Sequence, residues 1–190
     1  MALMFGDKIE PPADKGFAGY RFTSQDKKEV AQFRIDGFTF SRLSPYTKWI
    51  EVINEAKLLW QSYRSKAQPQ IINKISVHYI NRLDIPLPIR DFEDYLTASP
   101  SLPKALPQAL SEFLVRLVVH DDDLTAGIIQ TITRSPKAEH LGIIIDIDAF
   151  KSDKKGIKDK DIWKEFSRLH ELKNRIFFEL ITNKCVRLFK

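Results

Sequence analysis

The stretch KISVHYINRLDIP, residues 74–86, alternates between apolar and polar positions and is rich in β-branched and aromatic residues. One alternate set is apolar except for one amide, and the other is polar except for one isoleucine. No proline interrupts the stretch before Pro86 ends it. The pattern predicts a long strand with one packed and one wet face, joining two halves of one sheet. The two sets are Ile75, Val77, Tyr79, Asn81, Leu83 and Ser76, His78, Ile80, Arg82, Asp84.

The chain before this strand has a β pattern followed by a helical one. Residues 1–18 have no period and are expected to form an irregular lead-in. Strands are predicted at 20–23, 30–35 and 38–43, the last two joined by a type I′ turn at Asp36-Gly37. In that register Ile35 faces Phe38 and Phe33 faces Phe40.

A helix is predicted from Ser44, as N-cap, to Lys66, with Pro45 at its first position. Its apolar stripe is Trp49, Ile53, Ala56, Trp60 and Tyr63. Two tryptophans on one stripe are typical either of core packing or of a small-ligand pocket between sheet and helices, and core packing is the better explanation.

The second half repeats this plan. A short helix at 90–96 and strands at 112–120, 128–134 and 141–150 precede a helix over 159–184. The helix stripe is Trp163, Phe166, Leu169, Leu172, Ile176 and Leu180. We therefore predict an α+β fold: a curved, mainly antiparallel sheet with both long helices on one face.

The likeness of the two halves predicts an internal duplication of a strand–helix–three-strand–helix unit within one domain, with pseudo-repeats at 19–73 and 74–190. The plan is similar to TATA-binding-protein-like folds, an analogy that imports no DNA binding. The first copy lacks its opening strand and helix, which predicts an unpaired sheet edge near Phe17, Tyr20 and Phe22. We expect a homodimer or a partner protein at that edge.

Composition limits the function. The chain has 190 residues, 43% of them apolar, and a net charge of +5. Its single cysteine, Cys185, excludes an internal disulfide and a multi-cysteine zinc site. No apolar run approaches the roughly 20 residues of a membrane span, and the first residues lack a signal-peptide pattern. We expect a cytoplasmic protein that does not bind membranes and needs no cofactor.

Catalytic motifs of the GxGxxG, P-loop, GxSxG and HExxH types are absent from the sequence. The most enzyme-like feature is acidic: Asp146 and Asp148 alternate along one strand, near His120 and the turn 121–123. Carboxylates two residues apart point the same way and are weak candidates for binding Mg²⁺. The alternative, which we prefer, is that they mark the wet face of the strand.

Arginines on strands supply the candidate binding surface. Arg21, Arg34, Arg42 and Arg82 would form a broad cationic surface if they shared one wet sheet face. Such a surface binds a nucleic-acid backbone or an acidic protein partner. A plain solvated surface is the alternative.

The segments YRFTSQDKKEVAQFRIDGFTFSRLSPYTKW and HYINRLDIP resemble a sporadically distributed family of bacterial proteins of unknown function. Its members carry an (R/K)YINRIxIP signature, then a short acidic helix, here DFEDYL, and a C-terminal amphipathic helix. The resemblance covers roughly residues 19–189 and implies no established activity. The family's patchy distribution implies mobile or defence-associated genes. Within the signature, Asn81, Arg82 and Asp84 are either binding residues or structural ones.

These observations favour a non-catalytic binding module of a bacterial defence or toxin–antitoxin-type system, contacting protein or nucleic acid through the open sheet face. The alternatives are a metal-dependent enzyme acting on nucleic acid or nucleotide through Asp146 and Asp148, and a small-ligand sensor.

Overall fold

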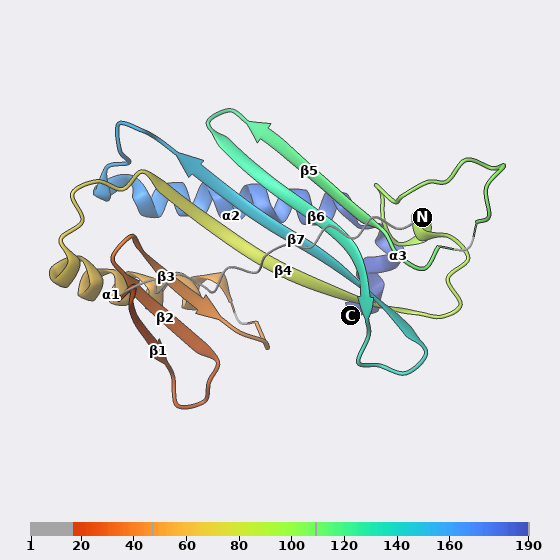
Figure 1. Ribbon diagram of the computed structural model, residues 1–190, viewed down its shortest axis with the longest axis horizontal. Coiled ribbons are helices and arrows are strands. Elements are labelled where there is room, and N and C mark those ends of the chain that lie inside the picture. Colours follow the sequence, from red (N-terminus) through yellow and green to blue (C-terminus); the bar gives the residue numbers. More distant parts are fainter. Residues whose placement is uncertain (1–16, 47, 109, 190) are drawn as a thin grey trace, which may run out of the picture. The chain divides into compact units, whose positions relative to one another are not determined.

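The computed structural model describes residues 17–46, 48–108 and 110–189. It is a mixed α+β structure with two antiparallel sheets (Figure 1), which confirms the predicted class. The chain divides into two compact units, Met1–Gln70 and Ile71–Lys190. The expectation of one continuous sheet is wrong, because each unit has its own sheet. Most of the predicted lead-in, residues 1–16, lies outside the described residues.

The first unit is a three-stranded meander followed by a helix. Its sheet has the order β1 (Gly19–Thr23), β2 (Glu29–Arg34), β3 (Gly37–Arg42), and the helix is α1 (Trp49–Ala67). Aromatic rings from one sheet face pack against the helix. Tyr63 lies 5.5 Å from Phe33 and 5.7 Å from Phe38, measured between ring centroids.

The β2–β3 turn differs from the predicted one. Arg34 pairs with Gly37 and Phe33 with Phe38, so the two loop residues are Ile35 and Asp36. Neither Asp36 nor Gly37 has a positive φ, which a type I′ turn at these two positions requires. The Asp36 carboxylate instead accepts two hydrogen bonds from the Arg34 guanidinium at the tip, at 2.8 and 3.0 Å.

Helix α1 starts later than predicted. Ser44 and Pro45 lie in a bend, and Lys48 takes the N-cap position with an extended conformation and no side-chain cap. A serine–proline pair is common in turns as well as at helix starts, so it does not by itself fix the first helical residue.

The second unit is a four-stranded sheet in the order β4-β7-β6-β5. Strand β4 (Lys74–Pro86) has the predicted bounds and the predicted alternation of buried and exposed residues. It does not join two halves of a sheet, because β4 is an edge strand that, within the part of the chain the structure describes, pairs with β7 (His140–Ser152) alone. The other strands are β5 (Leu114–Asp121) and β6 (Leu124–Arg134).

Strand β6 begins four residues before the predicted start. Asp121 pairs with Leu124, so Asp122 and Asp123 alone form the turn, and Asp122 has a φ of 56°. Aspartate tolerates this left-handed conformation, which allows a much tighter turn than the loop predicted between the strands at 112–120 and 128–134.

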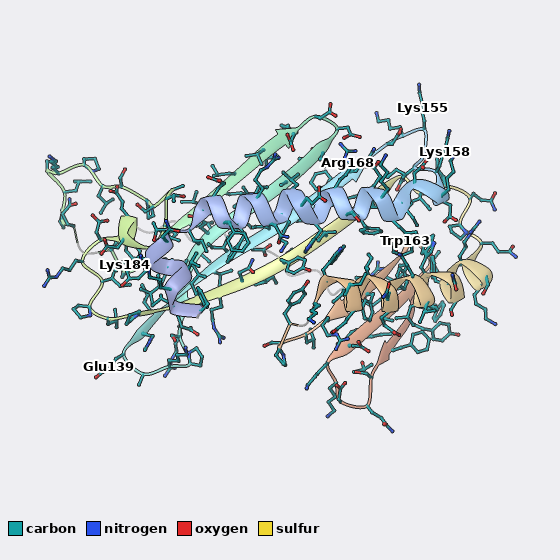
Figure 2. The ribbon with its side chains drawn as sticks, turned by 180° about the vertical axis from the view of Figure 1, so that it is seen from behind. Glu139, Lys155, Lys158, Trp163, Arg168 and Lys184 are labelled. Atoms are coloured by element: carbon teal, nitrogen blue, oxygen red, sulfur yellow. The ribbon has the colours of Figure 1, made fainter. Side chains whose placement is uncertain are left out.

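The long helix α2 (Ile162–Leu180) packs across β4 and β7 and covers one face of the sheet (Figure 2). The core between them is centred on Ile143, Ile145, Ile147, Leu169 and Leu172. The predicted helix to residue 184 is interrupted at Ile181, which is extended and bridges to Leu96. A short helix α3 (Asn183–Val186) and a 3₁₀ turn η3 (Arg187–Phe189) follow.

Two further 3₁₀ turns complete the second unit. The first, η1 (Phe92–Asp94), replaces the predicted helix at 90–96, and η2 (Asp159–Asp161) precedes α2. No helix among the described residues is long and apolar enough to cross a membrane.

Candidate interaction face of the four-stranded sheet

The face of the four-stranded sheet that points away from α2, here called the open face, is defined by strand register. Tyr79 packs against Lys173 of α2, so the odd-numbered residues of β4 face the helix and the even-numbered ones face away. Cross-strand partners share a face. One row across the open face is therefore His78, Asp148, Gly127 and Val118.

The next row is Ile80, Asp146, Ile129 and Arg116. Three large aliphatic side chains of the open face are strongly exposed: Ile80 by 66%, Val118 by 56% and Leu114 by 72%. The alternation within one strand predicts that one of its faces is wet. It does not predict which strands lie beside it, and therefore not which exposed apolar side chains share that face.

The two predicted aspartates do share the open face. His78, from β4, contacts Asp146 with 2.6 Å between Nε2 and Oδ1. In Asp148 the Oδ1 atom is buried and accepts no hydrogen bond from the described residues. A Cβ added to Gly127, the cross-strand neighbour of Asp148, would meet no atom within 4 Å. The sequence revealed the two aspartates but not His78, which is 68 residues away from Asp146.

The geometry gives little support to a metal centre. Within the part of the chain that the structure describes, no group of three or more His, Cys, Asp or Glu side chains could hold a metal ion. His120 contacts Thr125, at 3.2 Å between Nδ1 and Oγ1. The acidic turn 121–123 takes part in ion pairs with α2, on the helix side of the sheet.

These ion pairs form a network between the β5–β6 turn, β7 and α2. Asp123 contacts Arg168 at 2.7 Å and Lys151 at 2.5 Å, and both cations also contact the buried Glu165. The Arg168 and Lys151 side chains hold the pKa of Asp123 well below its ordinary value. Arg168 projects from the upper side of α2 in Figure 2. Asp121 is likewise paired, with Arg175.

The four candidate arginines do not share one face. Arg21 and Arg34 lie on the same side of the three-stranded sheet, but Arg42 lies on the aromatic side and pairs with Glu29 at 2.5 Å. Arg34 is paired with Asp36 at 2.8 Å. Because Arg82 belongs to the other sheet, the register does not produce the single cationic surface that the sequence suggested.

The signature residues have partners within the second unit. Asn81 donates through Nδ2 to the carbonyl oxygen of Ile145, at 3.1 Å. Arg82 contacts Asp84 at 3.3 Å, and Ser135 donates to the same carboxylate at 2.9 Å. The contacts of Asn81 and Asp84 connect β4 to β7 and to the loop after β6, which favours the structural explanation for these two residues, whereas the contact of Arg82 lies within β4.

Sequence reasoning missed a buried polar group on the helix side. Lys173 is 7% exposed, lies 3.8 Å above the Tyr79 ring and donates to Asn174 at 2.6 Å. Burial lowers the pKa of Lys173 to about 8. Burial, together with the Lys173 charge, lowers the pKa of His170 to about 4. A charged residue in a helical pattern is normally assigned to solvent, so no sequence signal marked Lys173.

Trp60, one of the two residues considered for a ligand pocket, contributes to aromatic packing. Its ring centroid lies 5.9 Å from Phe38 and 5.5 Å from Tyr63. This supports the core explanation of the tryptophan stripe.

Comparison with known proteins found no family model, no curated protein and no solved structure that matches this chain. The family resemblance of HYINRLDIP therefore stays a prediction.

Proposed function

We propose that this protein is a non-catalytic binding module that recognises another protein through the open face of its four-stranded sheet. The observation that carries the proposal is the exposure of Ile80, Leu114 and Val118 on one sheet face. Exposed aliphatic side chains among charged and polar groups are typical of protein interfaces.

Charge favours protein over nucleic acid as the partner. By register the open face carries three cations and three carboxylates, so its net charge is close to zero. Nucleic-acid affinity comes mainly from cations that neutralise phosphates, and a balanced face does not supply them. The residues concerned are Lys74, Arg82, Arg116, Asp84, Asp146 and Asp148.

The internal duplication and the TATA-binding-protein-like plan belong to the same proposal. Their support is that each unit has three consecutive antiparallel strands followed by a 19-residue helix. A place in a bacterial defence or toxin–antitoxin-type system, and a cytoplasmic location, are supported by the family resemblance and by composition.

Site-specific photo-cross-linking in the native host tests the open face. A benzophenone amino acid replaces Val118, and in a matched control it replaces Leu58, which is exposed to a similar extent (60%) on α1. We expect a discrete adduct from position 118 that is absent from position 58 and is destroyed by protease but not by nuclease. Introducing Asp148→Lys should reduce that adduct.

A nuclease-sensitive adduct would replace the proposal with nucleic-acid binding. Equal adducts at both positions, or none at position 118, would contradict a specific role for the open face.

A further inference from the structure

The outer edge of β4 is a long strand edge without a partner among the described residues. Strand β4 pairs with β7 in one unbroken register from Lys74 to Pro86 and with no other strand. Along those 13 residues there is no bulge, and proline occurs only at the end. Bulges and prolines within a strand are common ways of protecting a sheet edge, and an edge without them is a template for another strand.

An apolar groove lies beside the middle of this edge. It has a volume of about 350 Å³ and runs between residues 81–83 of β4 and the end of α2 with the segments that follow it. The aromatic side chains Phe178 and Phe189 are 59% and 56% exposed. The apolar lining is Phe177, Phe178, Ile181, Val186 and Phe189. The groove is therefore suited to a large apolar side chain next to the strand edge.

The groove also has cations. Arg82 lines it, and its side chain is about half exposed and contacts Asp84 through Nε. Arg187, directly after the lining residue Val186, is exposed. Cations at the groove favour an occupant that carries a carboxylate.

We propose that this groove and the β4 edge together bind an extended peptide segment of a partner protein. The segment adds a strand to β4 through main-chain hydrogen bonds and places a large apolar side chain in the groove. An aspartate or glutamate in the segment lies near Arg82. This site uses the strand edge and a groove on the helix side of β4, and it shares only Arg82 with the open face, so it goes beyond the function proposed above.

A phage-displayed library of random dodecapeptides, selected on the purified protein, tests the site. We expect enriched peptides to contain a large apolar residue and an acidic residue within a few positions of each other. Their synthetic versions should bind Phe178→Asp at least tenfold more weakly than the unchanged protein. Leu58→Asp is the matched control, since Leu58 is a helical residue with 60% exposure, and its affinity should be unchanged.

A second arm distinguishes strand addition from side-chain binding alone. Peptides N-methylated at alternate amides keep their side chains but cannot form the ladder, and they should lose at least tenfold in affinity. Arg82→Gln should weaken binding of acidic peptides and spare versions in which the acid is replaced by its amide.

Failure to enrich any peptide, or equal binding by Phe178→Asp or by the N-methylated peptides, would overturn the inference. A second copy of the chain as the occupant would be revealed by Phe178→Asp reducing self-association. Photo-cross-linking at Val118 is unaffected by these outcomes, so the open-face proposal is tested independently.

Discussion

Lys173 is the residue whose environment differs most from what its type suggests. Its ammonium group is buried against Tyr79, and its pKa of about 8 lies below the ordinary value of 10.5 because burial disfavours the charged form. Contact with the aromatic ring and with Asn174 offsets part of this cost. The charge is thus retained at neutral pH at the expense of stability.

We expect Lys173→Met to raise the free energy of unfolding at pH 7 by about 2 kcal/mol, because a charge no longer has to be buried. The pH dependence has a definite sign. Since the folded pKa is the lower one, the unfolded state binds more protons between pH 8 and 10.5, and the stability of the unchanged protein rises over that range. The variant should lack this rise.

Urea denaturation at pH 7, 8, 9 and 10 measures both effects, with the exposed Lys155→Met as a control that should change neither. A variant less stable at pH 7 would show that the Tyr79 and Asn174 contacts outweigh the desolvation of the ammonium group.

Asp146 and Asp148 lead to a prediction about metal ions. His78 already occupies one oxygen of Asp146, and the described residues provide no third ligand at this place. We expect millimolar Mg²⁺ or Mn²⁺ to raise the melting temperature by less than about 1 °C, since a bound ion would stabilise by mass action. A larger rise that disappears in Asp146→Asn/Asp148→Asn would restore the enzyme hypothesis.

At the residue scale, the sequence predicted which side chains share a strand face but not their contacts. Asp146 and Asp148 were placed correctly because strand alternation is local. The contact with His78 depends on the pairing of β4 with β7, which no local pattern encodes.

At the scale of the element, the predicted ends of strands and helices were correct where a local pattern defines them and wrong where long-range pairing does. Strand β4 was predicted to the residue because alternation and Pro86 define it locally. The end of α2 was not, because the break at Ile181 coincides with a bridge to Leu96, 85 positions earlier in the sequence. Long-range pairing thus overrode a helical pattern that was locally continuous.

The ion-pair network fixes the β5–β6 turn to α2, and Arg168 is its best-connected cation. It contacts both the buried Glu165 and Asp123, at 2.7 Å each. We expect Arg168→Ala to destabilise the protein by about 1–2 kcal/mol, because Glu165 loses a charged hydrogen bond while Lys151 still contacts it. The midpoint of urea unfolding measures the loss.

Lys155→Ala, at an exposed loop position, is the control for removing a cation and should leave the midpoint unchanged. The pH dependence supplies a second check. Because the pKa of Asp123 is depressed in the folded state, the stabilisation by the network should be present above pH 4 and lost as the pH falls further. An Arg168→Ala variant as stable as the unchanged protein would mean that solvent screens the network almost completely.

At the scale of the whole molecule, the sequence predicted the class and the order of elements but not the number of sheets. Alternation shows that a stretch is a strand and which residues share a face. It does not show which strand lies next to it, so β4 was expected between two halves and is instead an edge.

Among the described residues the first unit also has an unpaired edge, at β1. Strand β1 pairs there with β2 alone, and its aromatic residues Tyr20 and Phe22 are 63% and 51% exposed. They continue an aromatic row from Phe17 to Phe33, with ring centroids 5.1, 6.2 and 5.2 Å apart. An edge strand with exposed aromatic side chains is a template for pairing with a second chain.

We therefore predict that the protein forms a homodimer at micromolar concentration and that Phe22→Asp shifts it to monomer, because the charge would be buried in the interface. Sedimentation velocity from 1 to 50 µM measures the change. Leu58→Asp introduces the same charge at an apolar residue of α1 that is 60% exposed, and it serves as the matched control. If the unchanged protein sediments as a monomer over this whole concentration range, pairing between copies of this chain is contradicted. A dimer that resists Phe22→Asp but is lost in Phe178→Asp would place the interface at β4, because Phe178 lines the apolar groove beside that edge.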